Sequence, residues 1–158
     1  MKDNDLIADK LHFVKQEKLL NVQLKGRNIP VFILHKGGVQ GKPTIAIDCG
    51  IHAREWISPA VCRLFIEEYL RCAQPDAADC DDSFDEDFYA YNFAMFPLLN
   101  QDGYYYTWSN DRLWRKNRTP SEDGPCIGTD LNRNADVAWG ATGSSDNTCS
   151  QVGNICYM

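Results

Sequence analysis

The sequence predicts an α/β protein, in which helices flank a sheet. Three observations predict this class: a short apolar strand over Thr44–Asp48, a helix beginning near Pro59, and a second apolar strand over Phe88–Leu99. The length of 158 residues suits one domain with its own core. Because strands and helices alternate, we expect a parallel or mixed sheet, with Thr44–Asp48 as a buried central strand covered by that helix.

The composition is that of a soluble globular protein, and it narrows the classes of partner. Apolar residues make up 44% and charged residues 24% of the chain. No apolar run reaches the roughly 18 residues that predict a transmembrane helix. The net charge of −6 argues against nucleic acid or an anionic membrane as the main partner. The first residues, Met1–Phe13, lack the apolar stretch of a signal peptide.

Seven cysteines are many for a cytosolic enzyme and indicate an oxidising, extracellular compartment. The odd count leaves at least one thiol unpaired within the chain. We expect Cys49 and Cys62 to be small core residues rather than bridge partners, and the sequence leaves the pairing of Cys72, Cys80 and Cys156 open. The cysteine content and the missing signal peptide disagree, and a mature or partial sequence would reconcile them.

Three features precede the first apolar strand. Residues 5–20 carry spaced apolar side chains among charged ones and predict a surface helix. Asn21–Leu34 predicts a hairpin, because Val22–Leu24 and Ile29–Leu34 flank a Lys-Gly-Arg-Asn turn. A glycine-rich loop, Gly37–Pro43, then leads into the expected central strand.

The helix after that strand is expected to begin at Pro59, with Ser58 as its N-cap. Its apolar face is predicted to consist of Val61, Leu64, Phe65 and Tyr69. Gln74–Asp87 is an acidic loop, and a solvated surface is favoured over a calcium site because the EF-hand glycine and terminal glutamate are missing. The aromatic-rich strand Phe88–Leu99 follows, and Asn100–Gly103 is expected as the turn that ends it.

Groups that can carry out chemistry follow directly after the strand Thr44–Asp48. Gly50 ends the strand, and His52, Arg54 and Glu55 come next. The carboxyl end of a buried strand is where α/β proteins place ligands. An imidazole nitrogen and a carboxylate oxygen three residues apart can converge on one ion, and both are donor types that a catalytic zinc takes. The alternative for this pair is a loop histidine beside a charge favoured at a helix N-terminus.

Two later stretches are rich in groups that bind carboxylates. Tyr104–Arg118 combines arginines with tryptophans, and Asn132 and Arg133 are adjacent. A guanidinium binds a carboxylate through two parallel hydrogen bonds, so a small carboxylate ligand suits this acidic chain better than single-stranded nucleic acid. A basic solvated helix edge is the other interpretation of the first stretch. Asp130 could accept a hydrogen bond from a zinc-bound imidazole and so fix its orientation.

Four motifs together resemble the zinc metallocarboxypeptidases of the pancreatic A/B type. They occur in the order and approximate spacing of that family, at His52–Trp56, Asn100–Gly103, Arg112–Lys116 and Asp130–Asn134. The similarity extends from about Val22 to Cys149. It implies a truncated metallocarboxypeptidase-like fold, a mixed sheet with flanking helices, in which residues 1–149 form a partial catalytic domain and residues 150–158 a divergent tail.

The resemblance implies specific roles in the reaction for five residues. His52 and Glu55 would be zinc ligands, in the set of two histidines and one glutamate that carboxypeptidase A uses. Arg115 would be the catalytic residue that polarises the scissile carbonyl and stabilises its oxyanion. Asn132 and Arg133 would bind the terminal carboxylate of a peptide substrate, so that single residues are released from the C-terminus.

Supporting roles follow from the same resemblance. Arg54 and Arg112 would line the binding sites for substrate residues further from the scissile bond. Asp130 would orient the imidazole ring of His52 by accepting a hydrogen bond from it. Cys126 and Cys149 fall where the family places a disulfide, and the family is secreted.

Two departures from the family pattern lead to two functional hypotheses. Gln101 replaces the usual proline of the Asn-Pro-Asp-Gly turn, and the residues after Cys149 no longer match. The family's second zinc histidine, substrate-capping tyrosine and general-base glutamate lie beyond that point. The first hypothesis is a zinc-dependent carboxypeptidase represented by a partial chain. The second is a catalytically inactive truncated product of the same fold that binds C-terminal carboxylates weakly. We expect the chain as written not to cleave peptides at a useful rate, and its preference among C-terminal residues is not determined.

Overall fold

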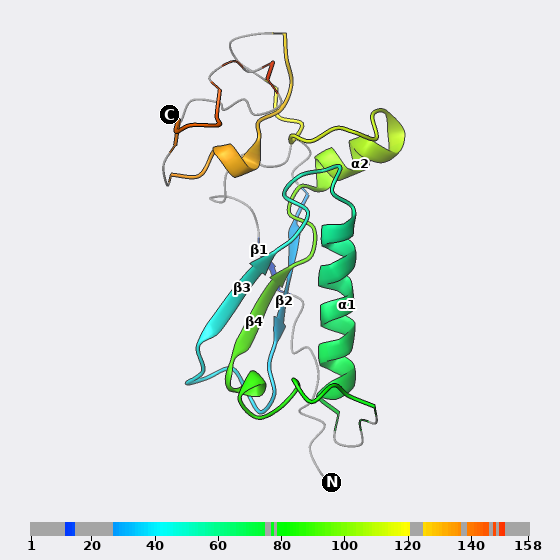
Figure 1. Ribbon diagram of the computed structural model, residues 1–158, viewed down its shortest axis with the longest axis vertical. Coiled ribbons are helices and arrows are strands. Elements are labelled where there is room, and N and C mark those ends of the chain that lie inside the picture. The colour runs from blue at the N-terminus through cyan, green and yellow to red at the C-terminus, as the bar shows by residue number, and fades with distance from the viewer. Residues whose placement is uncertain are drawn as a thin grey trace.

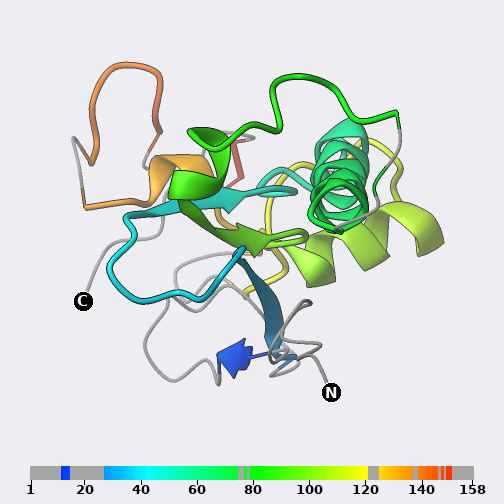
Figure 2. The same cartoon turned by 90° about the horizontal axis from the view of Figure 1, so that it is seen from below.

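The computed structural model describes residues 27–74, 77, 79–120, 125–136, 139–145, 147 and 149–150, together with the backbone of residues 12–14. It has two main layers, a four-stranded mixed sheet and a long helix, α1, that lies along one face of the sheet (Figure 1). Figure 2 shows the same helix nearly end-on. The predicted α/β class with a mixed sheet and flanking helices is confirmed.

The four strands are β1 (His12–Val14), β2 (Ile29–Leu34), β3 (Thr44–Asp48) and β4 (Asn92–Phe96), and they lie in the order β1-β2-β4-β3. β2 pairs antiparallel with both β1 and β4, whereas β3 pairs parallel with β4. Because parallel neighbours need a crossover connection, the chain passes through α1 between β3 and β4. The carboxyl ends of β3 and β4 therefore lie at the same end of the sheet (Figure 1).

β3 forms as predicted, but its expected place in the middle of the sheet is wrong. It is the edge strand of the sheet that the described residues form. Four of its five residues are exposed, and Ile45 keeps 40% of its surface in contact with solvent. Its apolar sequence is that of a strand covered on both sides, but within the described residues only β4 pairs with it.

Helix α1 spans Ile57–Cys72 and begins two residues before the predicted start. Trp56 occupies the N-cap position, and Ser58 does not cap the helix. The Ser58 hydroxyl instead accepts a hydrogen bond from the backbone N–H of Gly50 at 3.1 Å. This bond ties the first turn of α1 to the loop that leaves β3.

The buried face of α1 differs from the predicted face. Tyr69 is buried as expected and Phe65 is half-buried, but Val61 and Leu64 are each 56% exposed. The residues that face the sheet are Cys62, Ile66, Tyr69 and Cys72. Since apolar residues occur on both sides of the helix, the sequence pattern alone does not identify the side that meets the sheet. The core forms where this face meets Leu34, Phe93 and Met95.

Three disulfides occur among the described residues, joining Cys49 to Cys62, Cys72 to Cys80 and Cys126 to Cys149. The last is the pairing that the family resemblance implied. The prediction that Cys49 and Cys62 stay unpaired is wrong. Cys49 directly follows β3 and Cys62 lies on the inner face of α1, so their Cα atoms are 6.4 Å apart, within the range that a disulfide spans.

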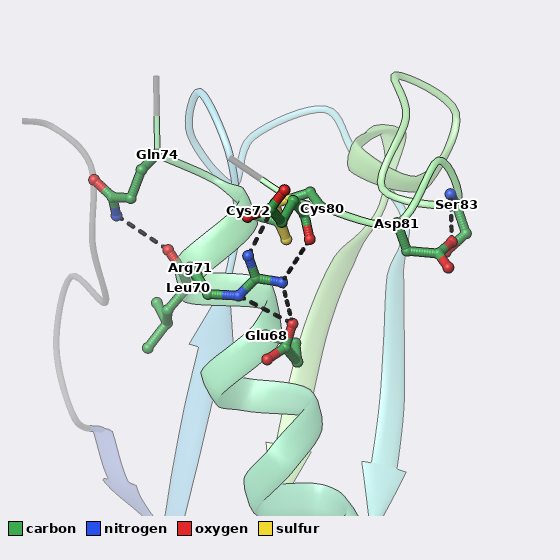
Figure 3. Close-up of a disulfide and its surroundings, with 9 residues drawn as sticks. Glu68, Leu70, Arg71, Cys72, Gln74, Cys80, Asp81 and Ser83 are labelled. Atoms are coloured by element: carbon green, nitrogen blue, oxygen red, sulfur yellow. Dashed lines mark hydrogen bonds and ion pairs between the residues drawn. A yellow bond between two sulfur atoms is a disulfide. The ribbon is translucent and has the colours of Figure 1, made fainter. Parts of the chain in front are cut away.

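The Cys72–Cys80 disulfide ties the C-terminal end of α1 to the acidic loop, and Figure 3 shows its surroundings. Arg71 donates from Nε to the Glu68 carboxylate at 3.1 Å and from Nη1 to the Cys80 sulfur at 3.6 Å. Glu68 and Arg71 are well exposed, so their ion pair contributes little to stability. The disulfide is therefore the main restraint that we identify at this end of the helix.

The remaining elements also correct the predicted boundaries. Phe88–Ala90 is a short 3-10 helix, η1, rather than the start of a strand. Asn100 is the N-cap of helix α2, Gln101–Ser109, so the predicted turn at residues 100–103 is the first turn of a helix. A second 3-10 helix, η2, spans Leu131–Arg133.

The N-terminal segment contains a strand where a helix was predicted. The helix predicted over residues 5–20 is wrong at His12–Val14, which form a strand because their backbone pairs with β2. The predicted strand Val22–Leu24 lies outside the described residues, as do Cys156 and all of the predicted tail except Ser150. In the part of the chain that is described, none of the helices has the length and apolar character needed to cross a bilayer.

Replacing Cys49 and Cys62 together by alanine should lower the free energy of unfolding by about 3 kcal/mol, since the bridge closes a loop of about 14 residues in the unfolded chain. Urea denaturation of the oxidised proteins measures this difference. The matched control is the double variant Cys72→Ala/Cys80→Ala, which opens a shorter loop and should lose slightly less. Unchanged stability of the first variant would contradict the pairing.

Replacing Tyr69 by phenylalanine should leave the protein as stable at neutral pH or stabilise it by about 1 kcal/mol, because the buried Tyr69 hydroxyl has no hydrogen-bond partner within the described chain. Burial, with a further contribution from Tyr89, raises the pKa of Tyr69 to about 12.

The raised pKa of Tyr69 also predicts a dependence on pH. The folded state favours the protonated, neutral form of Tyr69. The stability that this preference contributes is therefore fully present below about pH 10, and it is lost as the pH rises toward about 12. Tyr69→Phe should therefore lose less stability over this window than the wild type. Chemical denaturation at several pH values measures the effect, with Tyr91→Phe as the exposed control; equal losses would contradict the assignment.

Candidate active site

The loop between β3 and α1 carries the first site residues. Gly50 has a φ of 68°, and a Cβ atom there would lie 2.7 Å from Cδ1 of Leu98, so only glycine fits this bend. The backbone N–H of Ala53 donates to the carbonyl of Arg115 at 3.0 Å. This hydrogen bond joins the loop to the segment after α2, although the two are about 60 residues apart in sequence.

His52 is only 7% exposed and lies between two carboxylates. Its Nδ1 is 3.0 Å from Oε1 of Glu55, and its Nε2 is 3.1 Å from Oδ1 of Asp130. Asp130 is completely buried. Burial raises the pKa of Asp130, but hydrogen bonds from His52 and Arg115 outweigh burial and hold this pKa below its usual value. The Asp130 carboxylate is therefore ionised at neutral pH and accepts a hydrogen bond from the Nε2–H group of His52.

This arrangement determines what the other imidazole nitrogen can do. When Nε2 of His52 carries the proton, Nδ1 of a neutral ring presents its lone pair to the Glu55 carboxylate at 3.0 Å. Two lone pairs at this distance repel each other unless a proton or a metal ion lies between them. The donor types, one imidazole nitrogen and one carboxylate, fit zinc. Within the described residues, however, no three histidine, cysteine or acidic side chains converge as a complete metal site would need.

Arg115 completes a network with these groups. Its Nε and Nη2 each lie 3.0 Å from Oδ2 of Asp130, and its Nη1 lies 3.4 Å from Oε1 of Glu55. The structure thus brings together four of the predicted site residues: His52, Glu55, Arg115 and Asp130. The Arg115 guanidinium is held at the Glu55 carboxylate while 13% of its side chain remains exposed.

Arg54 and Arg112 are joined to each other beside this network. Arg112 donates from Nη1 to the carbonyl of Arg54 at 2.9 Å, and its guanidinium lies 3.8 Å from the ring centre of Trp56. The ring of Trp56 also stacks on the ring of Trp108, with centroids 4.2 Å apart. Cation–π and stacking contacts of this kind hold Arg112 in place without neutralising its charge.

Asn132 and Arg133 lie in η2, directly after Asp130. The backbone N–H of Asn132 donates to Oδ1 of Asp130 at 3.0 Å. Arg133 donates from Nε to the carbonyl of Gly143 at 3.0 Å and from Nη1 to the carbonyl of Asn132 at 2.8 Å. Within the described residues, the side chains of Asn132 and Arg133 do not join the His52–Glu55–Arg115 network, so their role in binding a terminal carboxylate stays a prediction.

Asn100 positions the site, a role that was not predicted from the sequence. Asn100 is fully buried; its side-chain amide donates to the carbonyls of Ile51 and Lys116, both at 3.1 Å. Its Oδ1 accepts from the N–H of Gly103 at 3.0 Å and caps α2. The carbonyls it binds lie next to His52 and Arg115, so one amide holds both segments. An asparagine before a helical segment is a recognisable capping signal.

Lys116 is a second positioning residue that the sequence did not single out. It is 3% exposed, and its Nζ donates to the carbonyl of Ser150 at 3.1 Å. Burial lowers the pKa of Lys116, and the nearby charge of Asp130 opposes that effect. Since Ser150 follows Cys149, this contact and the Cys126–Cys149 disulfide together fix the segments on either side of η2.

Comparisons with known proteins identify the family to which the sequence is similar. The zinc carboxypeptidase family model matches residues 22–154. Human carboxypeptidase O is 41% identical over 148 residues, which cover 92% of this chain and 38% of that protein. Human carboxypeptidase B is 42% identical over 136 residues, which cover 85% of this chain and 31% of that protein. The chain thus spans well under half the length of these curated relatives.

Solved structures give the same result. The crystal structure of thrombin activatable fibrinolysis inhibitor matches 80% of this chain and 30% of its own chain, with a TM-score of 0.66 and 38% identity. Carboxypeptidase A from Helicoverpa armigera matches 84% of this chain and 31% of its own, with a TM-score of 0.68 and 28% identity. Family model, relatives and fold coincide, and the chain belongs to the zinc carboxypeptidase family.

Proposed function

We propose that this chain carries the first half of a zinc-dependent carboxypeptidase site, which releases single amino acids from the C-termini of peptides. His52 would bind the metal through Nδ1 and Glu55 through its carboxylate. The observation that carries the proposal is the position of His52 between two carboxylates, with Nδ1 3.0 Å from Oε1 of Glu55 and Nε2 3.1 Å from Oδ1 of Asp130. A bound zinc ion would supply Lewis-acid polarisation of the reacting groups.

The residues of the chain supply positioning and fixed charge. Asp130 fixes the tautomer and orientation of His52 through its hydrogen bond to Nε2. Arg115 offers a guanidinium next to the proposed metal position, where it would stabilise negative charge developing on the substrate carbonyl. Asn132 and Arg133 would bind the terminal carboxylate, which makes the reaction exo-acting.

The neighbouring arginines would extend the binding site along the substrate. Arg54 and Arg112 are held together at one side of the network, where they would contact substrate residues further from the scissile bond. The proposed partners are therefore peptide and protein C-termini. The three disulfides support an extracellular location.

A second candidate function is favoured by the donor count. Two donors, His52 and Glu55, converge among the described residues, whereas a catalytic zinc generally takes three protein ligands. A chain with two donors would hold zinc weakly and would bind C-terminal carboxylates without cleaving them. The two candidates share their carboxylate-binding residues and differ in hydrolysis.

The metal assignment predicts weak but specific zinc binding by the purified chain. Calorimetric titration with zinc should show one site that His52→Ala or Glu55→Gln weakens at least about tenfold. Asp130→Asn should weaken it by about 10–100-fold through loss of the orienting hydrogen bond. Glu67→Gln is the matched control, because Glu67 pairs with Arg63 on the exposed side of α1. Wild-type affinity in His52→Ala would refute the assignment.

The carboxylate assignment predicts that a fluorescent peptide with a free C-terminus binds more tightly than the same peptide with a C-terminal amide. Arg133→Gln should remove this difference, and Arg63→Gln should preserve it. In the same samples, zinc-dependent release of the terminal residue, lost in His52→Ala, supports the carboxypeptidase. Binding without release favours the second candidate, and equal affinity for both peptides in the wild type would contradict both.

A further inference from the structure

A separate hollow of about 240 Å³ opens at the C-terminal half of α2. Tyr105, Tyr106, Ser109 and Asn110 line it from α2 and its C-cap, and two arginines, Arg27 and Arg118, line it from other segments. None of these residues has a part in the proposed zinc or substrate site. This hollow, the Arg118 hollow, is therefore separate from the proposed active site.

Arg118 is held there by aromatic rings rather than by an acid. Its guanidinium lies 3.7 Å from the ring centre of Tyr106 and 4.5 Å from that of Trp114. It forms no hydrogen bond or ion pair with any residue that the structure describes. The rings of Tyr106 and Trp114 meet edge to face, with planes 69° apart, and neither ring neutralises the charge of the guanidinium. The N–H groups of a guanidinium can bind an oxyanion bidentately.

Arg118 has no carboxylate partner among the described residues that line the hollow. Among the described residues that line the hollow, the one carboxylate is Asp102, which is 4% exposed and forms an ion pair with Arg27. Arg27 also lies over the ring of Tyr105 at 5.6 Å. Since Asp102 and Arg27 carry opposite charges, Arg118 supplies the remaining positive charge among the described lining residues, next to the hydroxyl and amide groups of that lining.

We propose that the Arg118 hollow binds a small tetrahedral oxyanion, a phosphate group, through the in-plane N–H groups of Arg118. The volume is sufficient for such a group and its first waters, because one water takes up about 30 Å³ of liquid volume. In a chain with a net charge of −6, a guanidinium that has no acidic partner among the described residues is a local exception. The proposal does not depend on the carboxypeptidase activity, because no residue of that site contributes to it.

The test is a titration of the full chain with inorganic phosphate and, separately, with phenyl phosphate, at constant ionic strength kept by sodium chloride and with no metal added. Tryptophan fluorescence reports on Trp114 beside Arg118, and the thermal midpoint reports on stabilisation. We expect saturable binding that Arg118→Gln weakens at least tenfold. Tighter binding of phenyl phosphate would assign the hollow to a phosphate ester, and tighter binding of inorganic phosphate to the free anion.

Two further variants keep the result interpretable if Arg118→Gln disturbs the ring packing. Ser109→Asp adds a negative charge to the lining while it leaves Arg118 and its rings unchanged, and it should also weaken binding at least tenfold. Arg63→Gln removes an exposed arginine of α1 outside the hollow and should bind phosphate like the wild type. A response that rises without saturation, that chloride reproduces, or that survives in folded Ser109→Asp would overturn the proposal.

Discussion

The buried carboxylate of Asp130 is the contact on which the rest of the site depends. It accepts hydrogen bonds from His52 Nε2, from two nitrogens of Arg115 and from the backbone of Asn132. These donors come from three segments, the loop after β3, the segment after α2, and η2. A carboxylate buried without partners costs several kcal/mol, roughly 3–5 when one partner of a buried pair is removed. Satisfying Asp130 therefore requires all three segments to be in place at once.

The sheet and α2 supply the frame for that contact. The parallel pairing of β3 with β4 sends both strands out at the same end of the sheet, where η2 and α2 also lie (Figure 1). Asn100, at the start of α2, then holds the carbonyls of Ile51 and Lys116 with one amide. The charged side chains of the site thus lie at one end of the sheet. The sheet packs against α1 through apolar side chains, among them Leu34, Phe93 and Met95.

Features with a local cause were predictable from residue patterns. Contacts between distant residues were predictable only where the family resemblance implied them, as for the Cys126–Cys149 disulfide and the His52–Asp130 contact. β3 formed as predicted because its apolar run and its glycine boundary are local. His52 and Glu55 are three residues apart on one loop, so their convergence also followed from spacing. The edge position of β3, by contrast, depends on which strands lie beside it. The buried face of α1 depends on the sheet, since Val61 and Leu64 are as apolar as the residues that are buried.

The errors in the polar and cysteine residues share one cause. Asn100 looked like a turn residue, and its side chain is buried because two carbonyls from distant loops need a donor. Cys49 and Cys62 looked like core residues, and they are buried, but the helix that follows β3 folds back and brings the sulfurs together. The burial of the two cysteines was predicted correctly. Their disulfide was not predicted, because it depends on the path of the crossover between β3 and α1.

The Cys49–Cys62 bridge has a consequence for the chain before it folds. The bridge encloses His52 and Glu55 in one covalent ring, so an oxidised chain carries both side chains in a ring of about 14 residues even when the sheet is absent. Ring closure restricts the distances that the two groups can sample and raises the concentration that each experiences of the other. In an oxidising environment, the Cys49–Cys62 disulfide therefore keeps His52 and Glu55 close together before the protein folds. In a reducing environment, only the sheet and Asp130 would bring the two side chains together.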